Sequence, residues 1–548
     1  MPEALSKQVD SLLHEYDRQM PSVAYALCDR HNPNQIALCY ENAAGEKQTH
    51  TYGELTKLSK KFAAVLHKLG VKKGHRVAIL LPKGPELFIS ALAVWRLGAI
   101  HVPLFTAFGP QAIAYRVNQS GAQIIITDSE NRAKLSEKTS EFEAVDTSRI
   151  QVITAASQSE QDHRGKSADI PFWQSLNRAE PLSKNSSVTG EDLFILLYTS
   201  GTTGQPKGVE VPVKALAAFE GYMRFGLDLR KDDVFWNIAD PGWAYGLYYA
   251  LIGPLLLGQT TIMYDGKFSV EEAYRILEDY EVTNFAAAPT VYRAMRAEGM
   301  PQETKEKLKL RVLSSAGEPL NPDVSAWAEI HFGVPIHDHY GQTEHGMIVN
   351  NHHEPELQEP IKIGSMGKPM PGCRVVIIDE EGNELPPGEE GQIAIDVKHS
   401  PLLWFHGYYQ DEKRTTERFT KDSRYYLTGD NGSRDEENHF YFSGRSDDII
   451  TSSGYKIGPF EVESAMMSHQ AVAEAAVVGA PDKKRGEIVK AFVVLRQGFE
   501  PSDELKEELS QFVKKHLSAH EYPREIEFVK TLPKTPSGKI QRFLLRQK

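Results

Sequence analysis

The sequence predicts an α/β protein with more than one domain. Helix and strand signals alternate through the first four-fifths of the chain. Short, continuously apolar runs recur among them, as in strands buried on both faces of a parallel sheet. The length of 548 residues, at about 150 residues per domain, indicates three to four units. With 41% hydrophobic and 25% charged residues, a large core is feasible and global disorder is excluded.

The first elements follow this alternation. Apolar residues recur at helical spacing over residues 51–69, and Gly70 is suited to cap the end of that helix. A second apolar helix is expected before Gly98. The polar stretch 130–187 is expected to be an elaborated surface segment and not part of the core. Three apolar runs predict buried strands: RVAILLP at 76–82, AQIIITD at 122–128 and DLFILLY at 192–198.

The texture changes near Gly364. Short strand signals such as VVIID are separated there by turn-rich segments such as EEGNELPPGEEG, which predicts a small β subdomain. After Arg445 comes a compact tail of about 100 residues, with strands at 475–479 and 489–495 and a helix at 503–516. No internal repeat or low-complexity tract is visible.

Charge and cysteine content exclude several classes. The net charge is −12, so nucleic-acid binding by bulk attraction is not expected. Three cysteines without a CxxC pair argue against a disulfide framework and a structural zinc site, and favour a reducing compartment. The N-terminal segment has no apolar run of signal-peptide length, and the apolar stretch 87–103 is interrupted by Arg96. We therefore expect a cytoplasmic protein without a membrane span.

The richest local motif is YTSGTTGQPKGVE at residues 198–210, directly after an apolar run. Its glycines allow the backbone to approach an anion closely, and its hydroxyl groups and one lysine can donate to phosphate oxygens. It is not a Walker P-loop, because Pro206 precedes Lys207 and Gly208 follows it. The motif therefore predicts a polyphosphate-binding loop of another type.

This loop resembles the signature motif of the acyl-adenylate-forming superfamily, which includes acyl-CoA synthetases, peptide-synthetase adenylation domains and firefly luciferases. Further segments similar to the family's motifs follow in the family's order: SSAGEPL at 314–320, DHYGQTEHG at 338–346, YLTGD at 426–430, GRSDDIITSSGYKIGPFEVE at 444–463 and PKTPSGKIQR at 533–542. The resemblance covers essentially the whole chain.

The resemblance also implies the domain organisation. Residues 1–445 would form a large N-terminal domain of layered α/β sheets, with the small β subdomain at about 364–445. Residues 446–447 would be a hinge, and residues 448–548 a mobile, smaller α+β domain.

Matching positions carry the implied nucleotide site. The aromatic ring of Tyr340 would stack on adenine, and Asp430 and Arg445 would contact the ribose. Thr343 would contact the α-phosphate, and Glu344 would help hold Mg²⁺, which takes one or two carboxylates together with phosphate oxygens. The implied nucleotide-binding residues are Thr199, Ser200, Gly201, Thr202, Thr203, Gly204, Lys207, Gly317, Glu318, Pro319, Asp338, His339, Tyr340, Gly341, Gln342, Thr343, Asp430, Arg445, Lys456 and Lys539.

The implied reaction has two steps. A carboxylic acid and ATP give an acyl-adenylate and pyrophosphate, and coenzyme A (CoA) then gives acyl-CoA and AMP. Lys207 would neutralise the departing phosphates, and Lys539 would bridge the carboxylate and the α-phosphate. With Thr343 and Glu344 they form the expected catalytic set. The C-terminal domain would then swing about Asp447 and present Ser453 and Gly454 to the pantetheine of CoA. ATP, Mg²⁺ and CoA are therefore the expected cofactors and co-substrates.

The sequence is most similar to those of the short- and medium-chain acyl-CoA synthetases. Acetyl-CoA synthetases carry a tryptophan at the position that matches Gly341, so glycine predicts a deeper acyl pocket. Trp243, Tyr245 and Gly246 are expected to contribute its walls, although Tyr245 is large enough to shorten or bend it. Propionate through octanoate, branched acids and benzoate-like acids all fit this prediction.

Other activities share these motifs. The alternatives are a stand-alone adenylation enzyme that loads a carrier protein, a luciferase-like enzyme and a catalytically silent nucleotide-binding regulator. No carrier domain follows Lys548, which favours free CoA as the acceptor. The context of Lys539 also resembles the site of reversible lysine acetylation in bacterial family members. A lysine acetyltransferase is therefore an expected partner.

Overall fold

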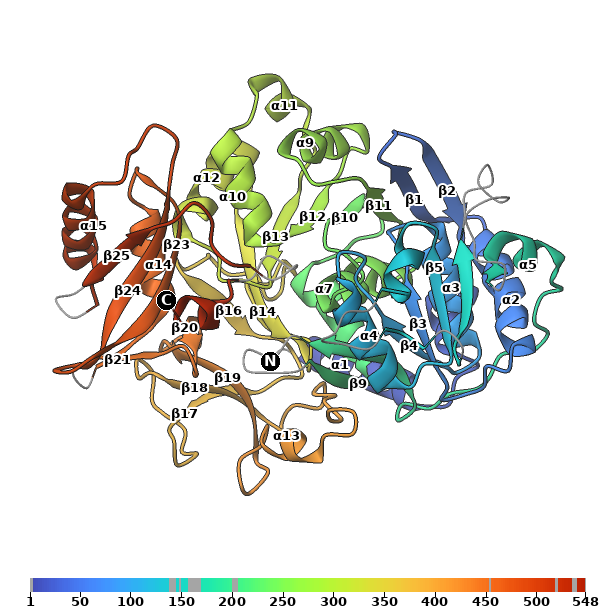
Figure 1. Ribbon diagram of the computed structural model, residues 1–548. Helices are drawn as coiled ribbons and strands as arrows, with labels where there is room; N and C mark the ends of the chain where they lie inside the picture. Colours follow the sequence, from blue (N-terminus) through green and yellow to red (C-terminus); the bar gives the residue numbers. More distant parts are fainter. Residues whose placement is uncertain are drawn as a thin grey trace.

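The computed structural model describes residues 3–137, 144–146, 149–155, 169–199, 206–452, 455–517, 521–534 and 540–547, with the backbone alone at 455 and 456. Within them the chain has the predicted α/β class and forms three sheets. In Figure 1 the C-terminal sheet, coloured orange to red, lies at one end of the molecule. The blue and cyan N-terminal sheet lies at the other end.

The N-terminal sheet has seven strands in the order β7-β6-β5-β3-β4-β8-β9, and all neighbours are parallel except β8 and β9. The three predicted apolar strands are confirmed as β3, β5 and β8. The strands are β3 (Arg76–Leu80), β4 (Ile100–Pro103), β5 (Ile124–Asp128), β6 (Gln151–Ala155), β7 (Ile170–Pro171), β8 (Leu193–Thr199) and β9 (Lys207–Pro212).

Four helices accompany this sheet: α2 (Tyr52–Lys68), α3 (Pro85–Arg96), α4 (Pro110–Ser120) and α5 (Phe172–Arg178). The predicted helix at 51–69 is confirmed as α2. Its N-cap Thr51 accepts from the amide of Glu54, whose carboxylate accepts from the amide of Thr51. Nearly every residue of α3 is buried, because this helix packs against both the sheet and α2.

The expectation that residues 130–187 lie only on the surface is wrong. This segment supplies β6 and β7 at the sheet edge, and α5, which packs against α2. Ile153, Phe172 and Leu176 are fully buried. Edge elements of this kind need only a few apolar residues each, and the polar residues between them hide the pattern.

The largest sheet has thirteen strands, and it runs from an N-terminal hairpin to the predicted β subdomain. Its central strands are parallel, and from β14 onward the neighbours are antiparallel. In spatial order they are β17 (Val375–Ile378), β18 (Gly391–Asp396), β19 (Tyr425–Arg434), β20 (Phe440–Arg445), β16 (Ser365–Pro369), β15 (Gly346–Asn350), β14 (Ile336–Gln342), β13 (Val312–Ala316), β12 (Asn284–Ala287), β10 (Phe235–Asn237), β11 (Thr261–Asp265), β1 (Ile36–Asn42) and β2 (Lys47–Thr51).

The β subdomain is therefore an extension of this sheet. Strands β16 to β20 all lie between residues 364 and 445, and β16 pairs with β15 on one side and β20 on the other. Hydrogen bonds thus run without interruption from the parallel strands into the subdomain.

Most other helices lie along the large sheet or between the two N-terminal sheets. They are α1 (Glu3–Asp17), α6 (Ala215–Gly221), α7 (Ala244–Gly246), α8 (Gly253–Leu256), α9 (Val270–Asp279), α10 (Pro289–Glu298), α11 (Gln302–Lys307), α12 (Pro322–Phe332) and α13 (Glu412–Thr416). Helix α6 continues as a π-helical turn at Tyr222–Gly226, and α7 as another at Leu247–Ile252.

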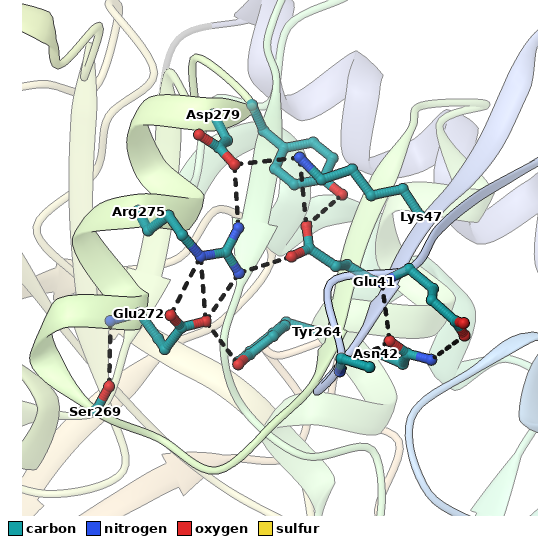
Figure 2. A network of polar contacts seen from close by, with 11 residues as sticks. Glu41, Asn42, Lys47, Tyr264, Ser269, Glu272, Arg275 and Asp279 are labelled. Atoms are coloured by element: carbon teal, nitrogen blue, oxygen red, sulfur yellow. Dashed lines mark hydrogen bonds and ion pairs between the residues drawn. The ribbon is translucent and has the colours of Figure 1, made fainter.

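A charged network fixes the β1–β2 hairpin to α9 (Figure 2). Glu41 of β1 is fully buried, and its carboxylate accepts from Arg275 at 2.7 Å and from the Tyr280 hydroxyl at 3.0 Å. Lys47 of β2 approaches the same carboxylate at 3.6 Å and pairs with Asp279 at 3.1 Å. The hairpin is thus tied to the large sheet through side chains as well as through the backbone.

The C-terminal sheet contains β21 (Ile450–Ser452), β22 (Tyr455–Ile457), β23 (Val472–Asp482), β24 (Gly486–Leu495) and β25 (Glu525–Phe528). Helices α14 (Pro459–Met467) and α15 (Asp503–His516) pack on one face, and Leu545 of α16 (Arg542–Leu545) packs on the other. The two predicted strands and the predicted helix of the tail are confirmed as β23, β24 and α15.

None of the helices that the structure describes is long and apolar enough to cross a membrane. Cys28, Cys39 and Cys373 lie in the described ranges as free thiols.

Candidate active site

A single cavity of about 1010 Å³ lies where the two N-terminal sheets meet the C-terminal domain. Its walls include the ends of strands β8, β13 and β14 and parts of β19 and β20. The cavity brings together these predicted site residues: Thr199, Lys207, Trp243, Tyr245, Gly317, Glu318, Pro319, Asp338, His339, Tyr340, Gly341, Gln342, Thr343, Glu344, Asp430, Arg445 and Asp447.

Several predicted residues lie outside the described part of the chain. They are Ser200, Gly201, Thr202, Thr203, Gly204, Ser453, Gly454 and Lys539, together with the side chain of Lys456. Their assigned roles stay predictions.

At one end of the cavity, Asp430 is held by three donors. The Tyr340 hydroxyl and the Gln342 amide each donate to its Oδ2 at 2.6 Å, and Arg445 lies 3.3 Å from its Oδ1. Asp430 is only 4% exposed, so these contacts fix a buried carboxylate at the cavity wall. A carboxylate in this position can accept hydrogen bonds from the hydroxyls of a sugar.

The predicted base-binding region surrounds Asp338 and Gly317. Burial raises the pKa of Asp338 to about 8, and its Oδ1 has no hydrogen-bond partner among the described residues. A carboxyl oxygen without a partner on a cavity wall can exchange a hydrogen bond with the edge of adenine. Gly317 has φ +100° with open space beside its Cα, which leaves room for a flat ring.

At the predicted phosphate end, cations gather around one carboxylate. Glu344 accepts from the Tyr408 hydroxyl at 2.8 Å, and Arg418 donates to the same hydroxyl oxygen at 2.8 Å. Lys207 Nζ lies 4.5 Å from the centre of the Tyr408 ring. Burial, followed by the charge of Arg418, lowers the pKa of Lys207. This excess of positive charge suits a polyphosphate.

The donor set fits a magnesium ion that arrives with phosphate. Among the residues that the structure describes, no group of three His, Cys, Asp or Glu side chains forms a self-sufficient metal site. Glu344 reaches the phosphate end, where its Oε1 accepts the hydrogen bond from Tyr408. Mg²⁺ commonly takes one or two protein carboxylates and completes its shell with phosphate and water oxygens.

Aromatic residues form the rest of the cavity. Trp243 packs against Phe105 and Phe108, with ring centroids 5.6 Å and 5.1 Å away. Tyr245 and Tyr248 come from α7 and the π-helical turn that follows it, and the Tyr248 hydroxyl donates to the carbonyl of Thr343 at 3.2 Å. This region is continuous with the phosphate end and suits an apolar acyl chain.

Two predicted pocket glycines have other reasons to be glycine. Gly246 does not line the cavity. Glycine is needed there because a Cβ would lie 2.1 Å from the carbonyl oxygen of Asp240. At Gly341 a Cβ would lie 2.2 Å from the carbonyl oxygen of Gly346 and 2.7 Å from Cα of Met347. Glycine is therefore required at 341 by the approach of β15 to β14. Its effect on the depth of the acyl pocket stays a prediction.

The model of the AMP-binding enzyme family matches residues 27–409, and that of the AMP-binding enzyme C-terminal domain matches residues 461–539. The chain belongs to the AMP-binding acyl-CoA synthetases. It is thus an acid–thiol ligase that forms AMP, with an ATP-binding adenylating site.

Relatives of this acyl-CoA synthetase cover nearly its whole length. It is 39% identical to the acetyl-coenzyme A synthetase of Bacillus subtilis (strain 168), over 96% of this chain and 90% of the relative. It is 37% identical to the mitochondrial acyl-coenzyme A synthetase ACSM3 of Mus musculus, over 92% and 85%. The crystal structure of a Brucella canis acyl-CoA synthetase is 48% identical, with a TM-score of 0.77 over 98% of this chain and 96% of that one.

Sequence reasoning missed several residues that complete the synthetase's site. Tyr408 and Arg418 organise the phosphate end. Their segment, HGYYQDEKRTTERF, does not belong to any of the motifs on which the sequence prediction rests. Tyr222 lies behind the acyl region in a π-helical turn. A cluster of cationic residues was the usable signal for Arg418, since Lys413, Arg414 and Arg418 lie within six residues of one another.

Proposed function

We propose that this synthetase activates a short- to medium-chain or branched carboxylic acid longer than acetate, with CoA as the acceptor and ATP bound as its magnesium complex. The observation that carries this proposal is the aromatic part of the cavity, which is continuous with the cationic phosphate end. Position 341 contributes no side chain to it, and Tyr245 and Met347 are among the residues that line it. The relatives include both acetyl- and acyl-coenzyme A synthetases, and these names agree with a small acid as the substrate.

The residues explain how adenylation would be assisted. A carboxylate must approach the α-phosphate, and both are negative, so the site has to neutralise charge before the two can react. Lys207 and Arg418 provide fixed positive charge beside the phosphates, and Arg445 and Asp430 fix the sugar. Mg²⁺ at Glu344 would supply further charge neutralisation. Lys539 is proposed to bridge the two anions, on the basis of the PKTPSGKIQR motif.

A panel of acids tests this proposal. The purified full chain would be assayed for AMP release with ATP, Mg²⁺ and CoA, against straight acids from acetate to decanoate, isobutyrate and benzoate. We expect CoA-dependent turnover with a maximum beyond acetate, and a gradual dependence on chain length, since each buried CH₂ contributes about 0.8 kcal/mol. A maximum at acetate would contradict the proposed acid class.

The same assay separates the acceptors. Pyrophosphate exchange without CoA-dependent turnover would indicate a carrier protein as the acceptor. Absence of both reactions with every acid would favour a nucleotide-binding regulator. Turnover with CoA supports the ligase that we propose.

Acetylation of Lys539 is a further part of the proposal. The modification would remove the charge that bridges carboxylate and phosphate, so we expect stoichiometric acetylation to abolish adenylation, with recovery after enzymatic deacetylation. Unchanged pyrophosphate exchange in the acetylated protein would refute this. A cytoplasmic location is also proposed, and fractionation of cells that express the full chain would test it.

A further inference from the structure

A chain of hydrogen bonds leads from the carbonyl of Asn351, just after β15, to the wall of the acyl region. Nε2 of His339 lies 3.1 Å from the carbonyl oxygen of Asn351, and Nδ1 of the same ring lies 2.6 Å from the Tyr222 hydroxyl. The Tyr222 hydroxyl lies 3.2 Å from the Tyr245 hydroxyl. Four groups are thus connected in series.

The direction of the protons along this chain is fixed. A carbonyl oxygen can only accept, so Nε2 of His339 must carry the proton. Burial lowers the pKa of His339 well below its usual value, so the ring is neutral and Nδ1 is an acceptor. Tyr222 must therefore donate to Nδ1. Its oxygen can then only accept the proton of Tyr245.

Tyr245 is where this chain reaches the cavity. Tyr222 is fully buried and does not line the cavity, whereas Tyr245 is partly exposed and does. The Tyr245 O–H is committed to Tyr222, and its oxygen accepts no hydrogen bond from any residue that the structure describes. At Tyr245 the acyl region therefore offers a substrate an acceptor and not a donor.

We propose that the preferred acid carries a hydroxyl or amino group beyond its carboxylate, which donates a hydrogen bond to the Tyr245 oxygen. This inference rests on the proposed function and narrows its substrate class. An unsubstituted alkyl acid would leave the Tyr245 acceptor without a partner. An oxo group in the same place would set two acceptors against each other.

Matched acids test the proposal. Butanoate, pentanoate, hexanoate and benzoate would each be compared with their hydroxy, fluoro and oxo derivatives, or acetyl derivatives for the ring. The substituent is placed at each carbon from C3 outward or at each ring position. Fluorine fills similar space but cannot donate. For at least one position we expect kcat/KM for the hydroxy acid to exceed that for the fluoro and oxo acids by about 3- to 10-fold, as for one neutral hydrogen bond.

Two variants separate this effect from pocket shape. Tyr245→Phe removes the acceptor, so the ratio of kcat/KM between hydroxy and fluoro acids should fall to about one. Tyr222→Phe removes the acceptor of the Tyr245 proton and frees that O–H for the cavity. The ratio of hydroxy to oxo acid should then fall at least about threefold, the size of one weak hydrogen bond. A structural role alone would not change that ratio.

Tyr248→Phe is the matched control. It removes a hydroxyl from the same cavity without touching the chain, because Tyr248 donates to the carbonyl of Thr343. It should change the turnover of hydroxy, fluoro and oxo acids by the same factor. Melting curves of all three variants check that they are folded.

The outcomes are distinct from those for the proposed function. Turnover of unsubstituted acids with no preference for a hydroxy acid at any position would overturn this inference and leave the proposed function standing. A preference that survives Tyr245→Phe would also overturn it. No CoA-dependent turnover of any acid would overturn both.

Discussion

Tyr408 connects the cations of the phosphate end to Glu344. Its hydroxyl donates to the carboxylate and accepts from Arg418, and it is only 3% exposed. Its backbone amide donates to the Thr415 hydroxyl at 2.9 Å, which fixes the residue from behind. Tyr408 therefore positions Glu344 at the predicted phosphate end.

We expect Tyr408→Phe to weaken adenylation. Loss of a hydrogen bond to a charged group costs about 1.5–3 kcal/mol, or about 10- to 100-fold, if the bond persists in the transition state. Glu344 would be less firmly held, so the Mg²⁺ concentration for half-maximal rate should rise as kcat falls. Pyrophosphate exchange over a Mg²⁺ titration measures both.

The neighbouring Tyr409→Phe is the control, since the Tyr409 hydroxyl accepts a hydrogen bond from Gln410 and takes no part in the contacts of Tyr408 with Glu344 and Arg418. It should leave the Mg²⁺ titration unchanged. An unchanged titration in Tyr408→Phe as well would show that Tyr408 does not position Glu344.

The raised pKa of Asp338 predicts that the stability of the fold depends on pH. Burial raises this pKa to about 8 in the fold, whereas the pKa of an unfolded Asp is about 3.9. Between about pH 4 and pH 8 the folded protein thus binds one more proton than the unfolded chain, so this group destabilises the fold increasingly as pH rises. Asp338→Asn mimics the protonated form. Its gain in melting temperature over the wild type, without nucleotide, should be larger at pH 8 than at pH 5.

The exposed Asp232→Asn serves as the comparison for Asp338→Asn, and its effect should be similar at the two pH values. If Asp338→Asn were equally stabilising at both, the carboxyl would not be held protonated in the fold.

Site residues were predictable where they share a motif. Tyr340, Gln342 and Glu344 are close in sequence, and one short segment predicts all of them together with Asp338. Tyr222 and Tyr408 have no such marker. They act through bonds to His339 and Glu344, which are 117 and 64 residues away, and only the fold creates those pairs.

At the level of elements, the β1–β2 hairpin depends on charged contacts with α9. Arg275 pairs with Glu41, Glu272 and Asp279, at 2.7, 2.8 and 3.0 Å (Figure 2). Ser269 caps α9 by accepting from the amide of Glu272, which places Glu272 and Arg275 on the face that meets the hairpin. Glu41 is the only one of these acids that the hairpin itself contributes in the described network.

We expect Glu41→Ala to loosen the hairpin. It leaves Arg275 and the Tyr280 hydroxyl without a buried acceptor, although Arg275 keeps two other carboxylates. The cost should be about 2–3 kcal/mol, below the usual range for breaking a buried pair. Hydrogen exchange of the amides of residues 36–42 reports this opening free energy directly.

Glu46→Ala changes an exposed acid of the same hairpin, which bonds only to Asn42 among the described side chains. It should alter the opening free energy by no more than about 0.5 kcal/mol. Equal effects of the two substitutions would mean that the buried network does not hold the hairpin.

Elements were predictable in proportion to how much apolar surface they bury. Strand β8 and helix α3 are buried along most of their length, and their sequences are correspondingly continuous in apolar residues. Strand β7 has two residues, and α5 buries Phe172 and Leu176 alone, so neither contrasts with the polar residues around it. The π-helical turns have no sequence pattern of their own.

At the scale of the molecule, the contacts between the C-terminal domain and the rest include an aromatic pair and a side-chain hydrogen bond. Phe460 of α14 lies edge-on to Phe442 of β20, with centroids 6.2 Å apart, and the Asn321 amide donates to the Ser464 hydroxyl at 3.3 Å. Arg546 donates to the carbonyl of Asp447 at 2.9 Å, so the end of the chain is bonded to the predicted hinge.

We expect Phe460→Ala to shift the domain away from this orientation, because Phe460 supplies an aromatic contact of the interface. Limited tryptic cleavage after Arg445 should become faster, by the factor that corresponds to about 1 kcal/mol of lost aromatic packing. Phe499→Ala, in an exposed loop of the same domain, is the control and should not change the cleavage rate. Equal rates in both variants would show that the Phe442–Phe460 contact does not hold the domain.

The close approach of β14 and β15 at Gly341 also limits how this enzyme can diverge. A bulky residue at 341 would require the backbone at Gly346 and Met347 to shift, because that backbone lies where a Cβ would be. Residue 346 is itself constrained, with φ +73° and the Tyr249 hydroxyl 2.7 Å from where a Cβ would lie. Narrowing the substrate range by that route would demand concerted substitutions on two strands and a neighbouring helix. Among proteins descended from this sequence, substitutions that change the substrate should instead occur at Tyr245, Met347 and the buried tyrosines behind them.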